Sequence, residues 1–318
     1  MVINQANMDA LFRTYSTALA EAQQAARQRA FPNQLIVGDL ALEMTAGGAA
    51  VQHAWLSQIR GMRKWVGDRV INNLETGTMT VVNDSFENTV GVPRTSIEDD
   101  QYGVFTPLIA ALGADAEQLW LRLAVAALVG NGAWADKNPF FCSGRKLGSG
   151  GTITNAVKTA FSKAAVETAL KDMRGWKLAG DEPADVTPDL LLVGPDLEGT
   201  AKSIVEADIE ANAAGTLAVS NVSTARMLKV RVDVRIPEGR WYVTARKAGI
   251  ACTAVQKRKT PKLTRMDRDT DQNVFMSDQF LYGVDARGAA FCTLPFLAYA
   301  GGFAEVPKWD KALLNNVA

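Results

Sequence analysis

The 318-residue sequence has little of what most enzyme and metal sites are built from, with one histidine and three cysteines. A single imidazole excludes zinc sites that need several histidines, and it allows a histidine-based catalytic triad at one place only, His53. The cysteines, Cys142, Cys252 and Cys292, are far apart and odd in number, so neither a disulfide framework nor a zinc knuckle is expected. This usage fits a reducing compartment and disfavours much hydrolase and metalloenzyme chemistry.

The sequence also has no excess charge and no long apolar run. It carries 34 basic and 34 acidic residues, whereas a dedicated nucleic-acid binder needs a basic excess, so any DNA contact should be weak or local. A membrane span needs about 18 consecutive apolar residues, and the longest candidate, residues 119–129, is interrupted by Arg122. No basic stretch followed by an apolar block stands at the start. We expect a soluble, intracellular protein of about two domains.

Helical periodicity marks several stretches. Residues 7–29 predict a helix whose apolar stripe fades after Leu19, which indicates an arm lying on another surface. A short helix is expected at 54–65, and further helices at 154–174 and 195–211. Residues 107–130 predict a spine helix roughly 35 Å long, with one continuous apolar face formed by Ile109, Leu112, Ala116, Leu119, Leu123 and Ala126.

Strand patterns occur between these helices, and we expect an α+β protein. Residues 69–74 and 78–82 flank Gly77 and predict a hairpin with its turn there. An isolated hairpin is marginal in water, so this one should lie against a neighbouring subunit. The candidate intersubunit contacts are Leu74, Glu75, Thr76, Gly77 and Met79. Residues 227–236 alternate strictly and predict a strand paired with 240–243, and further strands are expected at 188–193, 279–284 and 289–294.

Three motifs admit more than one interpretation. Residues 98–100 are consecutive acids that fit the first turn of a helix better than a metal cluster, because neighbouring helical residues point in different directions. The glycine-rich stretch 148–151 is typical of a linker rather than a phosphate-binding loop, since no Gly-Lys-Ser/Thr follows. Lys257, Arg258 and Lys259 are a candidate DNA contact, an intersubunit ion-pair partner or a solvated face. No catalytic, cofactor or metal site is predicted.

The order of these elements, and several short motifs, resemble a known family. An arm, a projecting hairpin, a spine helix and a mixed remainder resemble major capsid proteins of tailed phages with the Hong Kong 97-like fold. The sequence resembles the Mu-like prophage major head subunit (gpT) family in six short motifs, which are NQAN (4–7), WVGDR (65–69), FENTVGVPR (86–94), IEDD (97–100), YGVF (102–105) and PDLLLVGP (188–195). Residues 134–142 depart from that family's pattern, because its Thr-Asp-His has no counterpart here.

The resemblance implies a division of the chain into six parts. These are an N-terminal arm (1–50), an entry to the peripheral domain (51–67), an extended hairpin loop (68–95), a peripheral domain with the spine helix (96–185), an axial domain (186–272), and return strands of the peripheral domain with a C-terminal tail (273–318). The hairpin would overlie a neighbour in the capsomer, and the axial domain would meet its copies around five-fold and six-fold axes.

The implied function is structural. The resemblance predicts a capsid protein that forms hexamers and pentamers of an icosahedral shell, assembled in the bacterial cytoplasm around double-stranded DNA held by weak contacts. A separate scaffold protein, a portal and decoration proteins are the implied partners, with no membrane, no covalent crosslink and no cofactor. The alternatives are a nanocompartment shell of the same fold and, from another class, an enzyme built on His53 with Cys142 or a serine, where a packing or surface histidine is the simpler interpretation.

Overall fold

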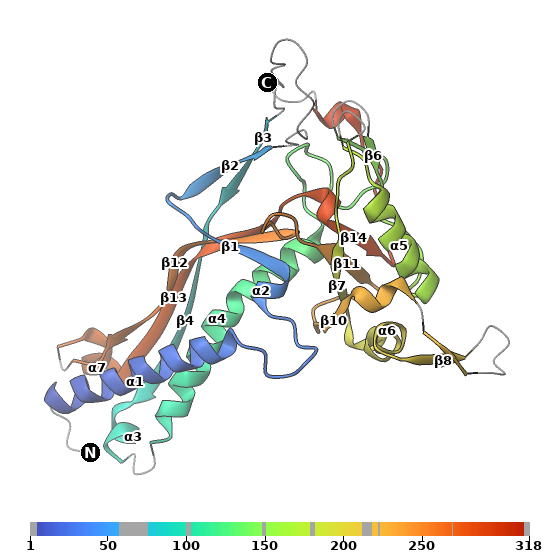
Figure 1. Ribbon diagram of the computed structural model, residues 1–318. Coiled ribbons are helices and arrows are strands. Elements are labelled where there is room, and N and C mark those ends of the chain that lie inside the picture. Colours follow the sequence, from blue (N-terminus) through green and yellow to red (C-terminus); the bar gives the residue numbers. More distant parts are fainter. Residues whose placement is uncertain are drawn as a thin grey trace, which may run out of the picture.

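Two four-stranded sheets lie on either side of one long helix. The computed structural model describes residues 5–56, 76–99, 103–147, 151–178, 182–211, 218–221, 223–268 and 270–314. Helix α4 (Phe105–Gly130) runs between the sheets and contacts β12 and β13 of the longer one (Figure 1). The predicted α+β class and spine helix are both confirmed.

The longer sheet has the strand order β1-β12-β13-β4. Its strands are β1 (Ala41–Thr45), β12 (Thr253–Met266), β13 (Gln279–Cys292) and β4 (Asp84–Pro93). Only β1 and β12 run parallel; the other neighbours are antiparallel. Along β13, buried Phe280, Tyr282 and Val284 alternate with more exposed residues, so one face of the sheet covers the core. The short helix α7 (Gln272–Ser277) connects the far ends of β12 and β13.

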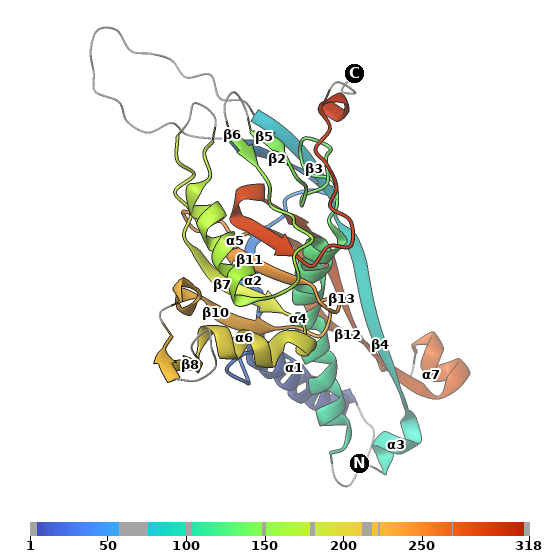
Figure 2. The same ribbon diagram turned by 90° about the vertical axis from the view of Figure 1, so that its right-hand side faces the viewer.

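The second sheet has the order β10-β7-β11-β14. Its strands are β10 (Lys229–Val232), β7 (Pro188–Val193), β11 (Trp241–Ala245) and β14 (Ala298–Gly301), with α5 (Lys163–Gly175) and α6 (Glu198–Val205) packed beside them (Figure 2). The predicted pairing of 227–236 with 240–243 is wrong, because β7 lies between them. The nearly continuous apolar run of β7 is buried on both faces and takes the central place, whereas β10 ends at Val232 in a turn.

Helix α4 is seated against the long sheet by Trp120, which is fully buried. A Cβ atom at Gly288 of β13 would lie 2.7 Å from the Trp120 ring, so only glycine lets the ring approach the strand. The buried stripe starts at Ile109 and Leu112 as predicted and then follows Trp120, Ala124 and Leu128. Leu119 and Leu123 of the predicted face are half-buried and pack against the core, whereas Ala126 is exposed, so the prediction is wrong at that residue only.

Helix α1 (Gln5–Ala26) packs on α4 of its own chain. Met8, Tyr15 and Leu19 are buried there, and the Tyr15 ring meets Tyr282 of β13 edge-on, with ring centroids 5.3 Å apart. The expected apolar stripe is therefore confirmed, but its partner is not a foreign surface. The short helix α2 (Val37–Leu40) then leads the chain into β1.

Other predicted helices begin or end elsewhere. The helix expected at 54–65 is wrong at its start, since β2 (Ala50–Leu56) is a strand, and 57–75 lie outside the described residues. Helix α5 begins at Lys163 because Ser162 accepts the Ala165 N–H as N-cap. After a 3₁₀ turn at Pro195–Leu197, α6 ends at Val205, and β8 (Ile209–Ala211) pairs with β9 (Ala218–Ser220). Three further elements are α3 (Arg94–Glu98), β5 (Arg145–Leu147) and β6 (Gly151–Ile153).

The strand pairing also cuts across two expected domain boundaries. Strand β12, expected in the axial part that ends at residue 272, lies in the long sheet beside α4. Strand β14, expected to return to the peripheral part, pairs with β11 in the second sheet. Residue order along the chain does not reveal these pairings, since the sheet in which a strand lies depends on contacts between segments that are distant in the sequence.

Candidate assembly surfaces

The projecting hairpin is formed by β2 (Ala50–Leu56) and β3 (Thr76–Val82). The two strands are antiparallel, and Trp55 lies opposite Gly77. Gly77 is thus inside a strand, and the predicted turn at this glycine is wrong. Residues 69–74, predicted as the first arm, lie outside the described residues. Of the candidate contact residues, Thr76 and Gly77 open β3, whereas Leu74 and Glu75 lie outside the described residues.

The base of the hairpin is attached to the long sheet by a small apolar cluster. Val81 of β3 is buried with Ala254 of β12 and Phe291 of β13, and Met79 packs against them. The His53 ring lies on the Phe291 ring, with centroids 4.6 Å apart. Met79 therefore contacts its own chain at this base, while Val82 at the end of β3 is 62% exposed. His53 has a packing role, as the simpler interpretation of the sequence had it.

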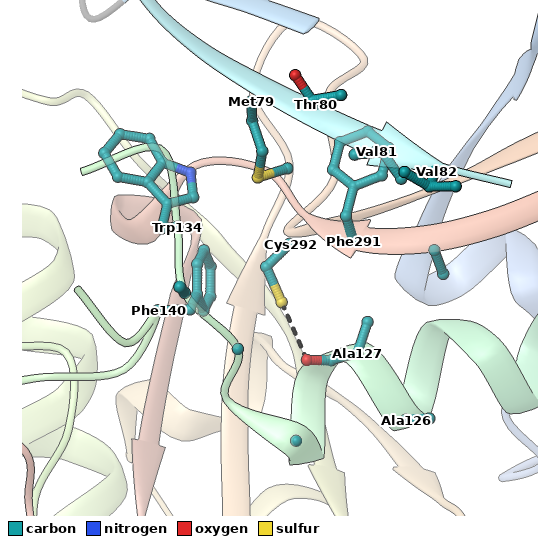
Figure 3. Close-up of a pocket in the computed structure, with 14 residues that line it drawn as sticks. Met79, Thr80, Val81, Val82, Ala126, Ala127, Trp134, Phe140, Phe291 and Cys292 are labelled. Carbon is teal, nitrogen blue, oxygen red and sulfur yellow. Dashed lines mark hydrogen bonds between the residues drawn. The ribbon is translucent and has the colours of Figure 1, made fainter. Parts of the chain in front are cut away.

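A cavity of about 410 Å³ separates the hairpin from the body of the subunit. Figure 3 shows Met79 and Val81 above it, with Trp134, Phe140 and Cys292 facing them from the body. The Cys292 thiol donates to the Ala127 carbonyl at the end of α4, at 3.3 Å, so its sulfur is engaged within the wall. The cavity lies between β3 and the end of α4, beside the apolar cluster that attaches the base of the hairpin.

The basic run 257–259 divides into three different environments. Lys257 is 9% exposed and forms ion pairs with Glu43, at 2.7 Å, and with the buried Glu117 of α4, at 3.5 Å. Arg258 is exposed and donates to the Ala46 carbonyl at 3.4 Å, and Lys259 forms an exposed ion pair with Asp285. Lys257 is thus buried between two carboxylates of its own chain, whereas Arg258 and Lys259 have the exposure that an external contact would need.

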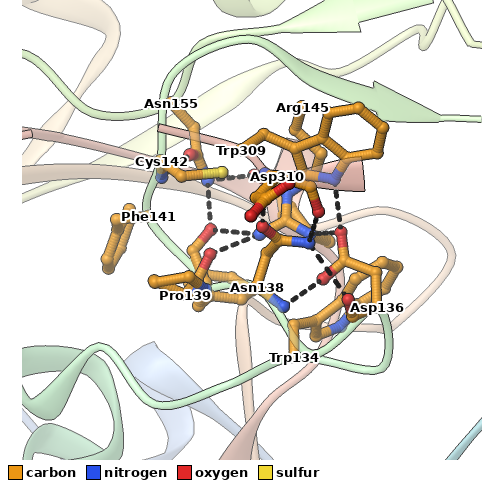
Figure 4. Close-up of polar contacts among 12 residues, drawn as sticks. Trp134, Asp136, Asn138, Pro139, Phe141, Cys142, Arg145, Asn155, Trp309 and Asp310 are labelled. Carbon is orange, nitrogen blue, oxygen red and sulfur yellow. Dashed lines mark hydrogen bonds and ion pairs between the residues drawn. The ribbon is translucent and has the colours of Figure 1, made fainter. Parts of the chain in front are cut away.

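The loop after α4 is organised around a buried arginine. The Arg145 side chain is 0% exposed; it forms an ion pair with Asp136 and donates to the Pro139 and Phe140 carbonyls (Figure 4). Its guanidinium also lies 5.2 Å from the Trp134 ring centroid. This is the stretch that departs from the family's sequence pattern, and the arginine fixes its conformation.

The same loop holds the end of the described chain. Trp309 donates through Nε1 to Asp136 at 3.1 Å, and the Asp310 N–H donates to the Asn138 side chain at 2.7 Å (Figure 4). Asn138 in turn donates to the Asp310 carbonyl at 3.2 Å. These contacts join residues about 170 positions apart in the sequence, so the last described segment is part of the body rather than a loose tail.

Large apolar side chains are exposed at the extremities of the molecule. Phe275 and Met276 on α7 are 84% and 70% exposed, and α7 lies at one end of the long sheet, far from the hairpin (Figures 1 and 2). Further exposed apolar residues are Phe31, Val82, Val234 and Ile209. Among these residues, Phe275 and Met276 are adjacent, and an exposed apolar group of neighbouring side chains is typical of surfaces that meet other proteins.

In the described part of the chain, the side chains form no metal-binding group and the cysteine thiols are not activated. No group of three or more histidine, cysteine or acidic side chains could hold a metal ion there. Burial raises the pKa of Cys142, raises that of Cys252 to about 12, and raises that of Cys292 well above its ordinary value, so these thiols are not nucleophiles at neutral pH. Within the described residues, no helix has both the length and the apolar content for a membrane span.

Comparison with known proteins shows which family has this architecture. A family model described as "Phage capsid protein" matches residues 78–291, from the hairpin to the end of the long sheet. The chain belongs to the phage capsid protein family. A second model, "Mu-like prophage major head subunit gpT", matches residues 8–143.

Two curated relatives and one solved structure agree with this membership. The capsid chain is 26% identical over 249 residues to the Mu-like prophage FluMu major head subunit of Haemophilus influenzae, covering 78% of this chain and 60% of that relative. It is 30% identical over 77 residues to the major capsid protein of Escherichia phage Mu, covering 24% of this chain and 25% of that protein. It spans only about 60% of the length of the Haemophilus influenzae relative.

The solved structure is a chain from the procapsid of bacteriophage JBD30, with a TM-score of 0.52 and 20% identity over 98% of this chain and 78% of that chain. This likeness shows the fold, which is the Hong Kong 97-like fold of phage capsid proteins. The resemblance noted in the sequence is confirmed.

The sequence reasoning missed the first strand of the hairpin and its attachment points. The usable signal was the alternation in residues 50–56, where Val51, His53 and Trp55 occupy every second position. Gln256 and Phe291, which hold the hairpin from β12 and β13, gave no signal, because their role depends on pairings between segments some 200 residues apart.

Proposed function

We propose that this chain is the major capsid subunit of a Mu-like tailed phage or prophage. Copies of it would form hexamers and pentamers of an icosahedral shell around double-stranded DNA, in the cytoplasm of the bacterial host. The observation that carries the proposal is membership of the phage capsid protein family over residues 78–291, supported by the match of residues 8–143 to the Mu-like head subunit model.

The distribution of exposed groups supports self-assembly. A ring of five or six identical subunits uses head-to-tail contacts, in which different patches of one subunit meet different patches of the next. The hairpin with exposed Val82 and the α7 end with exposed Phe275 are two such patches at distant places. Overlying a neighbour would cover the hairpin, which has little core of its own, and many modest contacts would add up through multivalency.

The division into arm, hairpin loop, peripheral and axial parts belongs to the same proposal, with β12 counted among the peripheral strands and β14 among the axial ones. So do the implied partners, which are a separate scaffold protein, a portal, decoration proteins and DNA held by weak local contacts. Arg258 and Lys259 are the residues of the basic run that could reach DNA or a neighbouring subunit. No enzymatic role is proposed.

The test is expression of the protein followed by gel filtration and electron microscopy. Capsomers, tubes or closed shells are expected, and a denaturing gel of purified shells should show a single monomer band, since no crosslink is proposed. A small monodisperse species at all concentrations, with and without a scaffold protein, would overturn the proposal. Shells that enclose protein cargo and no DNA when isolated from the native host would instead favour the nanocompartment alternative.

A further inference from the structure

One buried amide connects the hairpin to the body of the subunit. Gln256 of β12 is fully buried, and its Nε2 donates to the Val81 carbonyl at 3.2 Å and to Asn83 Oδ1 at 2.8 Å. Its Oε1 lies 2.8 Å from His53 Nε2 on the other hairpin strand. Asn83, itself buried, donates through Nδ2 to the Gly48 carbonyl at 2.8 Å. We call Gln256, His53 and Asn83 the hairpin node.

Backbone carbonyls fix the direction of every bond in the node. The Val81 carbonyl can only accept, so the Gln256 amide must turn its NH₂ toward β3 and its oxygen toward His53. That oxygen can only accept, so His53 donates its Nε2–H. The Gly48 carbonyl can also only accept, so the Asn83 side chain turns its NH₂ toward Gly48 and its oxygen toward Gln256. The node therefore has one self-consistent arrangement, and both hydrogens of the Gln256 amide are used.

The node touches the hairpin at four places along its chain. Gly48 precedes β2, His53 lies in β2, Val81 lies in β3 and Asn83 follows β3. A connection to both strands, at the base where the chain enters and leaves the hairpin, opposes rotation of the hairpin as well as separation from the sheet. Apolar packing is sparse by comparison, because the buried cluster at the base is small and the cavity of about 410 Å³ separates the hairpin from the α4 end.

We propose that Gln256 is a positioning residue that sets the angle at which the β2–β3 hairpin leaves the body, and so the place where the hairpin meets a neighbouring subunit. The second part of this statement rests on the proposed shell function. An apolar residue of similar size would fill the same space but leave the Val81 carbonyl and the Asn83 and His53 side chains without their partner in a buried position. A buried polar network that is fully satisfied favours one geometry over its neighbours.

The test measures the hairpin angle in the unassembled subunit. Spin labels are attached at Thr80→Cys on β3 and Lys171→Cys on α5, which are both exposed, whereas the native thiols are buried. Pulsed electron paramagnetic resonance then gives the distribution of label-to-label distances. We expect one narrow distribution for the otherwise unchanged protein and a broadened or shifted one for Gln256→Leu.

Thr253→Val is the matched control. Thr253 is equally buried in the same strand and donates to the Leu40 carbonyl at 2.9 Å, so its loss removes a buried hydrogen bond away from the hairpin. Both variants should lower the melting temperature, but Thr253→Val should keep the narrow distribution. His53→Phe keeps a ring on Phe291 and removes the N–H donor, and it serves as the second variant, expected to broaden the distribution even if Gln256→Leu does not fold.

The positioning role is overturned if Gln256→Leu gives the same distance distribution as the unchanged protein. If Gln256→Leu does not fold, His53→Phe decides by the same criterion. Broadening in Thr253→Val as well would overturn the role, since the effect would then follow from general destabilisation. Assembly is scored separately: the unchanged protein and Thr253→Val should form shells, and Gln256→Leu should form fewer or irregular ones. Failure of the unchanged protein to assemble would count against the shell function alone, because the distances in the free subunit still decide the role of Gln256.

Discussion

Single residues of the same type have very different roles in this subunit. Arg145 and Lys257 are buried ion-pair partners inside the chain, whereas Arg122 pairs with Asp115 at the surface. The sequence could not separate these cases, because burial of a charge depends on which distant segments cover it. Lys257 illustrates this: its neighbours Arg258 and Lys259 are exposed, and its partners Glu43 and Glu117 come from β1 and α4.

Arg145→Met should strongly destabilise the subunit. The variant leaves Asp136 without its cation and two carbonyls without their donor in a buried place, and breaking such a pair costs about 3–5 kcal/mol of unfolding free energy. Urea unfolding measures the change. The matched control is Arg122→Met, whose exposed pair with Asp115 should contribute only about 0–1 kcal/mol. Equal midpoints for Arg145→Met and the unchanged protein would show that the Arg145 network adds no stability.

The buried thiols should make the fold sensitive to alkaline pH. Burial raises the pKa of Cys252 from 9.0 to about 12, so between these values the unfolded thiol loses its proton while the folded one keeps it. The unfolded state then binds fewer protons, and the free energy of unfolding falls as pH rises through this window. Below pH 9 the thiol is protonated in both states, and its contribution to the free energy of unfolding is fully present.

Cys252→Ala removes this contribution, whereas Tyr242 and Tyr299, whose pKa values are raised too, remain in both proteins. Urea unfolding under reducing conditions, repeated from pH 8 upward, should give a shallower decline for the variant, by up to about 1.4 kcal/mol per pH unit. The substitution also removes buried volume, which lowers the variant's stability at every pH and leaves the slope difference intact. Parallel declines would contradict the raised pKa.

At the scale of elements, the periodicity of the sequence predicted the helices and strands whose formation depends on residues close together in the chain. Helix α4 was predicted because its apolar residues recur at helical spacing over many turns. Strand β2 was missed because Trp55, Ile59, Met62 and Val66 repeat at helical spacing, and that pattern competes with the alternation in residues 50–56. Pairing of β2 with β3, and the place of β12 in the long sheet, depend on which strands meet in space, and sequence spacing carries no information on that.

The contact between α1 and α4 depends on a glycine in the middle of α4. A Cβ atom at Gly113 would lie 2.7 Å from the Leu19 carbonyl oxygen and 2.9 Å from Leu19 Cγ, so Gly113→Ala must push the two helices apart. Overpacking of this kind costs typically about 1–3 kcal/mol. We expect lower stability together with faster hydrogen exchange of α1 amides, measured by mass spectrometry.

Gly130→Ala provides the control for that experiment, since it makes the same substitution at the end of the same helix, where a Cβ atom would meet nothing within 4 Å. Alanine has the higher helix propensity, so this variant should be as stable as the unchanged protein or up to about 1 kcal/mol more stable. Hydrogen exchange in α1 should stay unchanged. If both variants behave alike, the close approach of Leu19 to Gly113 does not hold the arm.

At the scale of the whole molecule, the absence of net charge and the exposed apolar ends both favour association between copies of the chain. A subunit of 34 basic and 34 acidic residues has no net repulsion from its own copies, so modest apolar contacts suffice to bring them together. The hairpin has two faces with separate roles: Val81 is buried against its own sheet, and Val82 is exposed. A substitution at the exposed Val82 can therefore test assembly with little effect on the fold.

Val82→Asp should abolish or slow shell assembly and leave the subunit folded. An exposed position away from buried contacts changes stability by about 0.5 kcal/mol or less, whereas a carboxylate placed in an apolar contact between subunits must be desolvated without a partner. Val82→Thr keeps the shape and strand propensity of valine without adding charge, so it should assemble nearly as well as the unchanged protein. Light scattering follows assembly, and urea unfolding checks the free subunit. Normal shells from Val82→Asp would show that this face of the hairpin does not meet a neighbour, whereas failure of both variants to fold would show that Val82 serves its own chain.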